Sequence, residues 1–125
     1  MKTILALILL ISTNAFGDEW TRGDTYREAA FQTLNIIDWG QTRYIAQNPD
    51  RFYEKDYSGL IGSNHPTTER IDIVMSEIAV SHFIISKALV HYGYRTAADL
   101  FQYITIGGKL NSAINNASIG IEVSF

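Results

Sequence analysis

Three histidines are the side chains of this sequence best suited to acid–base chemistry or metal binding. They are His65, His82 and His91. His82 and His91 are nine residues apart, so on one helix they would point to opposite sides and could not share a metal ion. The histidine spacings of helical zinc sites do not occur. We therefore expect no metal and no cofactor, and we interpret His82 as a core histidine that hydrogen-bonds across helices.

Two groups of residues could in principle support hydrolysis. Ser81 and His82 are adjacent, but neighbouring residues on a helix do not face each other, which argues against a nucleophile–base pair. Glu54 lies in a charged segment ahead of His65, and this pair could perform acid–base chemistry in a small hydrolase. A solvated loop of mixed charge explains the same residues, so we expect no enzyme and keep the hydrolase as an alternative.

The first residues of the chain have the three parts of a secretory signal peptide. A positive charge precedes an apolar run from Ile4 to Ile11, and the small residues Ala15 and Gly17 fit cleavage after Gly17. The run is shorter than the roughly 20 residues that a membrane span requires, and an uncleaved anchor is the alternative. We expect a signal peptide at 1–17 and a single helical domain at 18–125, either periplasmic or associated with the inner membrane.

Composition narrows the choice of partners. The chain has no cysteine, which excludes disulfides and thiolate metal sites, and its net charge is −3. Nucleic-acid binding needs a basic stripe to neutralise phosphates, and the sequence has none. We expect an envelope protein or a membrane as partner, and no nucleic acid.

Helical periodicity predicts an all-α domain of three helices, at 25–47, 68–92 and 96–115. Thr25 and Glu28 fit a capping box at the start of the first helix, and Thr67 fits an N-cap for the second. A long ordered loop should connect these two helices. The alternating residues 117–125 predict a short C-terminal strand, through which the protein could self-associate.

Each helix has an apolar side that we expect to face the core. The two best-defined sides are Tyr26, Ala30, Leu34, Ile37, Tyr44 and Ile45 in the first helix, and Leu100, Tyr103, Ile104, Gly107, Leu110 and Ile114 in the third. Gly107 and Gly108 should permit close helix approach. The second helix is apolar on nearly all sides, which is typical of a central helix or a membrane span. A small integral membrane bundle is therefore the main alternative to a soluble or peripheral domain.

Polar residues interrupt the first helix near its end, in the stretch IIDWGQT. Asp38, Gln41 and Thr42 share one helix face, and a buried carboxylate needs partners. Candidates are Arg43, Arg95, His82 and amides of the long loop. We expect a polar clamp that holds the long loop, with Gly40 permitting close approach. The predicted site comprises Asp38, Trp39, Gln41, Thr42, Tyr53, Glu54, His65, His82 and Arg95.

The stretch DWGQTRYIAQNPDRFYEKDYSGLIGSNHP resembles an uncharacterised family of small exported or membrane-associated proteins of proteobacteria and their phages. The residues that carry the resemblance are Asp38, Gln41, Thr42, Tyr53, Glu54, Leu60, Gly62, Pro66, His82, Arg95 and Asn115. The sequence departs from the family pattern at KDYSGLIG, which has two extra residues where Asn–Pro is expected. The family has no assigned reaction, so the resemblance implies an envelope protein of a bacterium or phage and no catalytic role.

These features favour a non-enzymatic exported protein that binds or blocks a partner in the bacterial cell envelope. For a phage-encoded protein, superinfection exclusion or lysis would be the corresponding roles. The alternatives are a small integral membrane bundle of unknown role, and a small hydrolase using Glu54 and His65.

The signal peptide gives the first testable prediction. The exported protein should begin at Asp18, because cleavage after Gly17 removes the apolar run. Mass spectrometry of the protein recovered from the periplasmic or membrane fraction measures this directly. A chain that begins at Met1 would instead identify residues 1–17 as an anchor.

Overall fold

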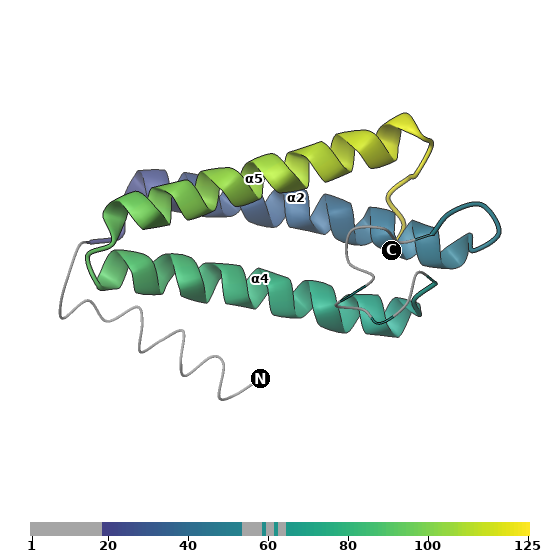
Figure 1. Cartoon of the computed structure of the whole chain (residues 1–125), viewed down its shortest axis with the longest axis horizontal. Coiled ribbons are helices and arrows are strands. Elements are labelled where there is room, and N and C mark those ends of the chain that lie inside the picture. The colour runs from purple at the N-terminus through teal and green to yellow at the C-terminus, as the bar shows by residue number, and fades with distance from the viewer. Residues whose placement is uncertain (1–18, 54–58, 60–61, 63–64) are drawn as a thin grey trace.

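The computed structural model describes residues 19–53, 59, 62 and 65–125. The described part consists of three long helices, α2 (Arg22–Gln47), α4 (Thr68–His91) and α5 (Arg95–Ser118). They lie side by side, and α4 runs antiparallel to α2 and α5 (Figure 1). The predicted all-α class and the three helices are confirmed. The predicted signal peptide and much of the loop between α2 and α4 lie outside the described residues.

The helix ends agree with the predicted ones to within a turn, with one correction. Thr21, and not Thr25, caps α2: its hydroxyl accepts from the Asp24 amide at 3.2 Å, and Asp24 accepts from the Thr21 amide at 2.8 Å. Both TRGD and TYRE fit the capping-box pattern, and the first is used. Thr67 caps α4 as predicted, accepting from the Arg70 amide at 3.2 Å.

The predicted C-terminal strand is wrong. Helix α5 continues to Ser118, and residues 119–125 form no strand. Gly120 has φ +88°, a conformation that favours glycine, and turns the chain back toward α2. There the Ser124 amide donates to the Gly40 carbonyl at 3.0 Å. The described C-terminal residues therefore provide no strand through which the protein could self-associate in the predicted way.

Gly40 permits close approach as predicted, but the segment that approaches is the C-terminal tail. A Cβ atom at Gly40 would lie 2.7 Å from the Phe125 ring and would also meet Val123. The Phe125 ring lies edge-on to Trp39, with ring centroids 6.2 Å apart. The tail can thus pack against the last turns of α2 because Gly40 carries no side chain.

The predicted apolar side of α2 faces the interior only in part, since Leu34, Ile37 and Tyr44 are half-buried. Of its six residues only Ile45 is buried, and Tyr26 is among the most exposed side chains. The buried side instead follows alternate steps of four and three residues, the spacing at which one face of a helix meets its neighbours. Its residues are Asp24, Glu28, Phe31, Asn35, Asp38, Thr42 and Ile45.

The predicted inward side of α5 points outward. Leu100, Tyr103, Ile104, Leu110 and Ile114 are all exposed, and the buried residues of α5 are Ala98, Gln102, Lys109 and Ala113. A Cβ atom at Gly107 or Gly108 would meet nothing within 4 Å, so these glycines do not allow a close helix contact. The bundle therefore buries many polar residues of α2 and α5, and several of their large apolar residues are exposed.

The apolar core is small and lies between α2 and α4. Ile71, Val74 and Met75 of α4 form it. Trp39, Ala46 and Ile78 are packed against them. Helix α2 contacts α5 more extensively than it contacts α4, and the contact between α4 and α5 is the smallest of the three. The α2–α5 interface, which is mainly polar, is therefore the largest in the bundle.

We expect Gly40→Ala to displace the C-terminal tail, because the added methyl group would overlap Phe125. In a Trp20→Phe background the emission of Trp39 should shift to the red as water replaces Phe125, while helix content by circular dichroism stays unchanged. Gly107→Ala is the matched control. Its methyl group meets nothing, so it should leave the emission unchanged and stabilise α5 by about 1 kcal/mol. An unchanged spectrum for Gly40→Ala would contradict this account of the tail.

Candidate functional site

The candidate site is the polar inner side of α2, where three carboxylates meet basic side chains of the other helices. Asp24 binds Arg95, Glu28 binds His82, and Asp38 binds Lys109. A buried charge is tolerated when it is paired and hydrogen-bonded. Asp24 and Asp38 lie about 21 Å apart along α2, at 1.5 Å per residue. The pairs therefore occupy separate levels of the bundle, and do not form one cluster.

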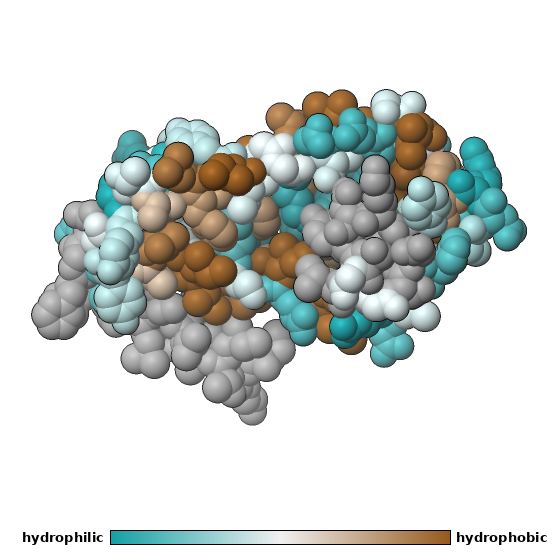
Figure 2. All heavy atoms as spheres, viewed as in Figure 1, coloured by the Kyte–Doolittle hydropathy of each residue, from teal (hydrophilic) through white to brown (hydrophobic). Residues whose placement is uncertain are grey.

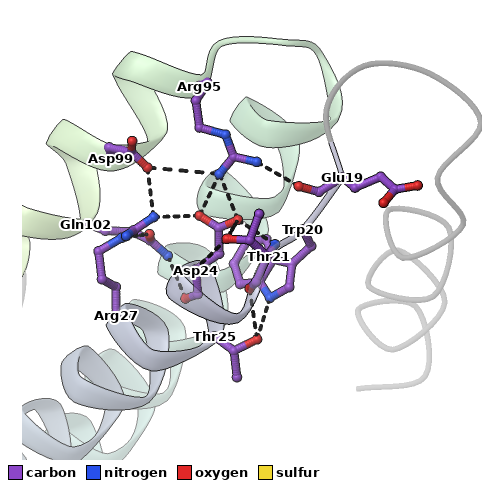
Figure 3. Close-up of polar contacts among 9 residues, drawn as sticks. All are labelled: Glu19, Trp20, Thr21, Asp24, Thr25, Arg27, Arg95, Asp99 and Gln102. Carbon is purple, nitrogen blue, oxygen red and sulfur yellow. Dashed lines mark hydrogen bonds and ion pairs between the residues drawn. The ribbon is translucent and has the colours of Figure 1, made fainter.

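The first level is at the start of α2 (Figure 3). Arg95 donates to both oxygens of Asp24 at 2.7 Å, and it also donates to the Glu19 carbonyl at 2.7 Å. Arg27 lies between Asp24 and Asp99, 2.7 Å from an oxygen of each. This network joins the start of α5 to the start of α2.

Asp24 is fully buried, and its hydrogen bonds decide its charge state. Burial alone would raise the pKa of this carboxyl, but the hydrogen bonds from Arg95 and Thr21 outweigh it and hold the pKa below 3.8. A carboxyl whose pKa is lowered by folding contributes stability above its unfolded pKa, and this contribution is lost as the pH falls through the lowered value. The pair therefore stabilises the fold at neutral pH.

The second level centres on His82, which hydrogen-bonds across helices as predicted. Its Nδ1 lies 2.9 Å from Glu28 of α2, and its Nε2 lies 2.7 Å from the Thr105 hydroxyl of α5. The ring is stacked between Phe31, at 3.5 Å between centroids, and Phe101, at 4.7 Å. Burial would raise the pKa of Glu28, but hydrogen bonds from His82 and Gln32 outweigh it and lower the pKa.

Glu28, His82 and Thr105 form a carboxylate–imidazole–hydroxyl chain with the distances of a catalytic triad. The Thr105 hydroxyl also lies 2.7 Å from the Phe101 carbonyl one turn earlier, the usual bond of a threonine inside a helix. Amide groups in mid-helix already donate to carbonyls of the same helix, so none near Thr105 is left to stabilise an oxyanion. This geometry supports a structural role for the hydrogen bonds that join Glu28, His82 and Thr105.

The third level contains the predicted clamp residues. Lys109 donates to Asp38 at 2.6 Å, and the two side chains are 6% and 2% exposed. Thr42 donates to the Asp38 carbonyl at 2.8 Å. Gln41 donates to the Ala113 carbonyl at 3.1 Å and accepts from Asn116 at 3.2 Å. The clamp therefore binds α5, and much of the loop that it was predicted to hold lies outside the described residues.

Trp39 and Arg43 lie on another side of α2 and share one carboxylate of α4. The Trp39 ring nitrogen donates to Asp72 at 2.7 Å, and Arg43 lies 2.6 Å from both oxygens of Asp72. The hydrogen bond from Arg43 lowers the pKa of Asp72. These contacts fix the last turns of α2 against the first turns of α4.

The structure thus distributes the predicted site residues along the whole bundle. None of the three side chains expected to bind Asp38 does so, because Arg43 pairs with Asp72, Arg95 with Asp24 and His82 with Glu28. The loop amides expected as further partners lie partly outside the described residues. Tyr53 and His65 are exposed, and Glu54 lies outside the described residues.

Sequence reasoning missed Lys109, Asp24, Glu28 and Gln102. The signal that could have found Lys109 is its position as the one charge between residues 100 and 121, on the side of α5 opposite the apolar residues. Among the described residues, no three His, Cys, Asp or Glu side chains lie where they could hold one metal ion.

Comparisons with known proteins add no relative. No family model matches the chain, and neither a curated protein nor a solved structure matches it. The family resemblance of the stretch from Asp38 to Pro66 therefore stays a prediction.

Asp38→Ala should cost about 3–5 kcal/mol of unfolding free energy, because Lys109 stays in the interior without its carboxylate. Asp50→Ala, at an exposed position, should change it by about 0.5 kcal/mol or less. Asp38→Ala combined with Lys109→Met should recover most of the loss, since the uncompensated charge is removed. Thermal melts of the three purified variants provide the comparison. Equal melting temperatures for the two single variants would show that the pair contributes nothing.

Proposed function

We propose that this chain is a non-enzymatic exported protein that binds an apolar partner in the bacterial envelope through the outer surface of α5. We define the α5 outer surface as the exposed side chains of Leu100, Tyr103, Ile104, Leu110 and Ile114. Large contiguous apolar areas on the outside of a protein mark interaction sites. The outward orientation of these residues is the observation that carries the proposal.

The α5 outer surface carries no charge along its length, and the exposed Asn111 is a polar residue among its apolar ones. Between residues 100 and 121 the sequence contains one charge, Lys109, and that side chain is turned into the bundle. Apolar side chains gather over α5 and over the edge of α4 that faces it (Figure 2). Beyond α5, Ile119 and Val123 of the tail are exposed as well. A water-facing helix would carry charged residues on this side.

The ionisable groups support a binding role over an enzymatic one. Asp24, Glu28 and Asp38 are each bonded to a basic partner, which leaves them engaged in holding the helices together. Glu54, which the alternative hydrolase would use together with His65, lies outside the described residues. The envelope location rests on the predicted signal peptide.

Cell fractionation tests the proposal. The protein should sediment with envelope membranes and stay there in high salt, because apolar contacts are not screened by ions. Ile104→Glu should release most of it to the soluble periplasm by placing a carboxylate in the α5 outer surface. Ile36→Glu is the matched control, since Ile36 of α2 is 54% exposed and Ile104 is 69% exposed.

Both variants should melt close to the wild-type temperature, because both substitutions are at exposed positions. Release of both variants to the same extent would contradict the proposal, and so would a wild-type protein found only in the soluble fraction. Alkaline carbonate provides a further distinction. A surface-bound protein is extracted, whereas an integral bundle stays in the pellet.

A further inference from the structure

We propose that the partner of the α5 outer surface is the lipid bilayer itself, on which the bundle lies with α5 toward the hydrocarbon. The inference deepens the proposed function and rests on it. It concerns the chemistry of the partner: a zwitterionic lipid surface, bound without a protein receptor.

The distribution of polar groups on α5 is what a helix in contact with lipid requires. Hydrocarbon offers no hydrogen bonds, so polar groups must be satisfied within the protein. Gln102 donates to the Asp24 carbonyl and accepts from Arg27, Thr105 bonds to His82, and Lys109 bonds to Asp38. The buried polar residues of α5 are therefore satisfied by α2 and α4, and its outward side is mainly apolar, with Asn111 as a polar residue among the apolar ones.

The residue types favour lipid over a protein partner. Protein interfaces are enriched in Tyr, Trp and Arg and have a polar rim that forms hydrogen bonds. Four of the five residues of the α5 outer surface are Leu or Ile, and Gly107 and Gly108 lie open beside them. From Leu100 to Ile114 the surface is about 21 Å long, at 1.5 Å per residue. Aliphatic side chains on a helix surface without charges suit a fluid partner without fixed hydrogen-bonding positions.

A hollow beside α5 also suits lipid chains. It has a volume of about 440 Å³ and lies between α4 and α5, with Ile78, Ile85, Phe101 and Gly108 among its lining residues. Its polar lining residues are Ser81, His82, Thr105, Lys109 and Ser112. Of these, His82 already bonds to Glu28 and Thr105, and Lys109 to Asp38. An apolar chain could fill this hollow without breaking a hydrogen bond.

Aromatic and basic residues meet at the ends of α2 and α4 nearest the start of α5. Lys87 lies over the Trp20 ring at 4.3 Å, and Arg27 lies over the Tyr103 ring at 5.2 Å. Burial lowers the pKa of Lys87. Trp, Tyr, Lys and Arg are the residues that occupy the boundary between hydrocarbon and headgroups. This end of the bundle is thus suited to the headgroup region.

The bundle should lie on the membrane and not span it. Among the described helices, α4 alone is long and apolar enough to cross a bilayer. Its Glu77 is exposed near the middle of the helix, where a charge at the bilayer centre would cost about 2.5–3.5 kcal/mol. A protein that rests on α5 leaves Glu77 in water, because Glu77 does not line the hollow between α4 and α5, whose α4 residues are Ile78, Ser81, His82 and Ile85.

Flotation with pure phosphatidylcholine vesicles tests the proposal on the purified exported protein. We expect it to float with the vesicles, equally at low salt and at about 0.5 M salt, because the binding is apolar. Ile104→Glu should lower the partition coefficient roughly tenfold or more, and Ile36→Glu should leave it within about twofold. Equal loss in both variants would overturn the proposal.

A second measurement does not depend on how well a charged variant folds. The chain has no cysteine, so Ile104→Cys and Ile36→Cys each give one site for an environment-sensitive dye. Vesicles should shift the emission to the blue at position 104 and leave it unchanged at position 36. No shift at position 104 would overturn the proposal.

The two proposals fail in distinguishable ways. A folded protein that ignores pure vesicles, yet sediments with envelope membranes through Ile104, has a protein receptor, and the lipid inference is then wrong. A protein that forms a dimer through the α5 outer surface, and binds vesicles in neither form, also overturns it. If Ile104 affects neither assay, the proposed function fails as well.

Discussion

The fold depends on the need of buried carboxylates for partners. Asp24, Glu28 and Asp38 lie on the side of α2 that faces the other helices, and a lone buried carboxylate would destabilise the bundle by several kcal/mol. Each is matched by a basic side chain of α4 or α5 at a different level. These pairs align α5 along α2 and α4 beside it. The outward orientation of the apolar residues of α5 follows from this alignment.

The ion pairs thus link the interior to the outer surface. Once Lys109 is turned inward to reach Asp38, helical geometry places Leu100, Gly107 and Asn111 on the opposite side of α5. The same side chains that looked like a core stripe become an external surface. The small apolar core of α4 carries only part of the packing, and polar pairing at the α2–α5 interface provides the remaining specificity.

Gly40 of α2 determines how the C-terminal tail is packed. The alternating residues of the tail have the pattern of a strand, but a strand needs a partner with free backbone groups. The tail meets a helix instead, and Gly40 is the position where a backbone carbonyl of α2 can be reached. The single bond from Ser124 and the ring of Phe125 then fix the tail across α2.

The sequence by itself determined the three helices, the end of α2 at Gln47, the cap at Thr67 and the cross-helix hydrogen bonds of His82. These follow from local rules, because periodicity, caps and turn glycines act within a few residues. Tertiary structure alone decided which side of α2 and α5 faces inward. An apolar stripe and a polar stripe at the same spacing compete for the interior, and the outcome depends on whether residues far apart in the chain, such as Asp38 and Lys109, can meet.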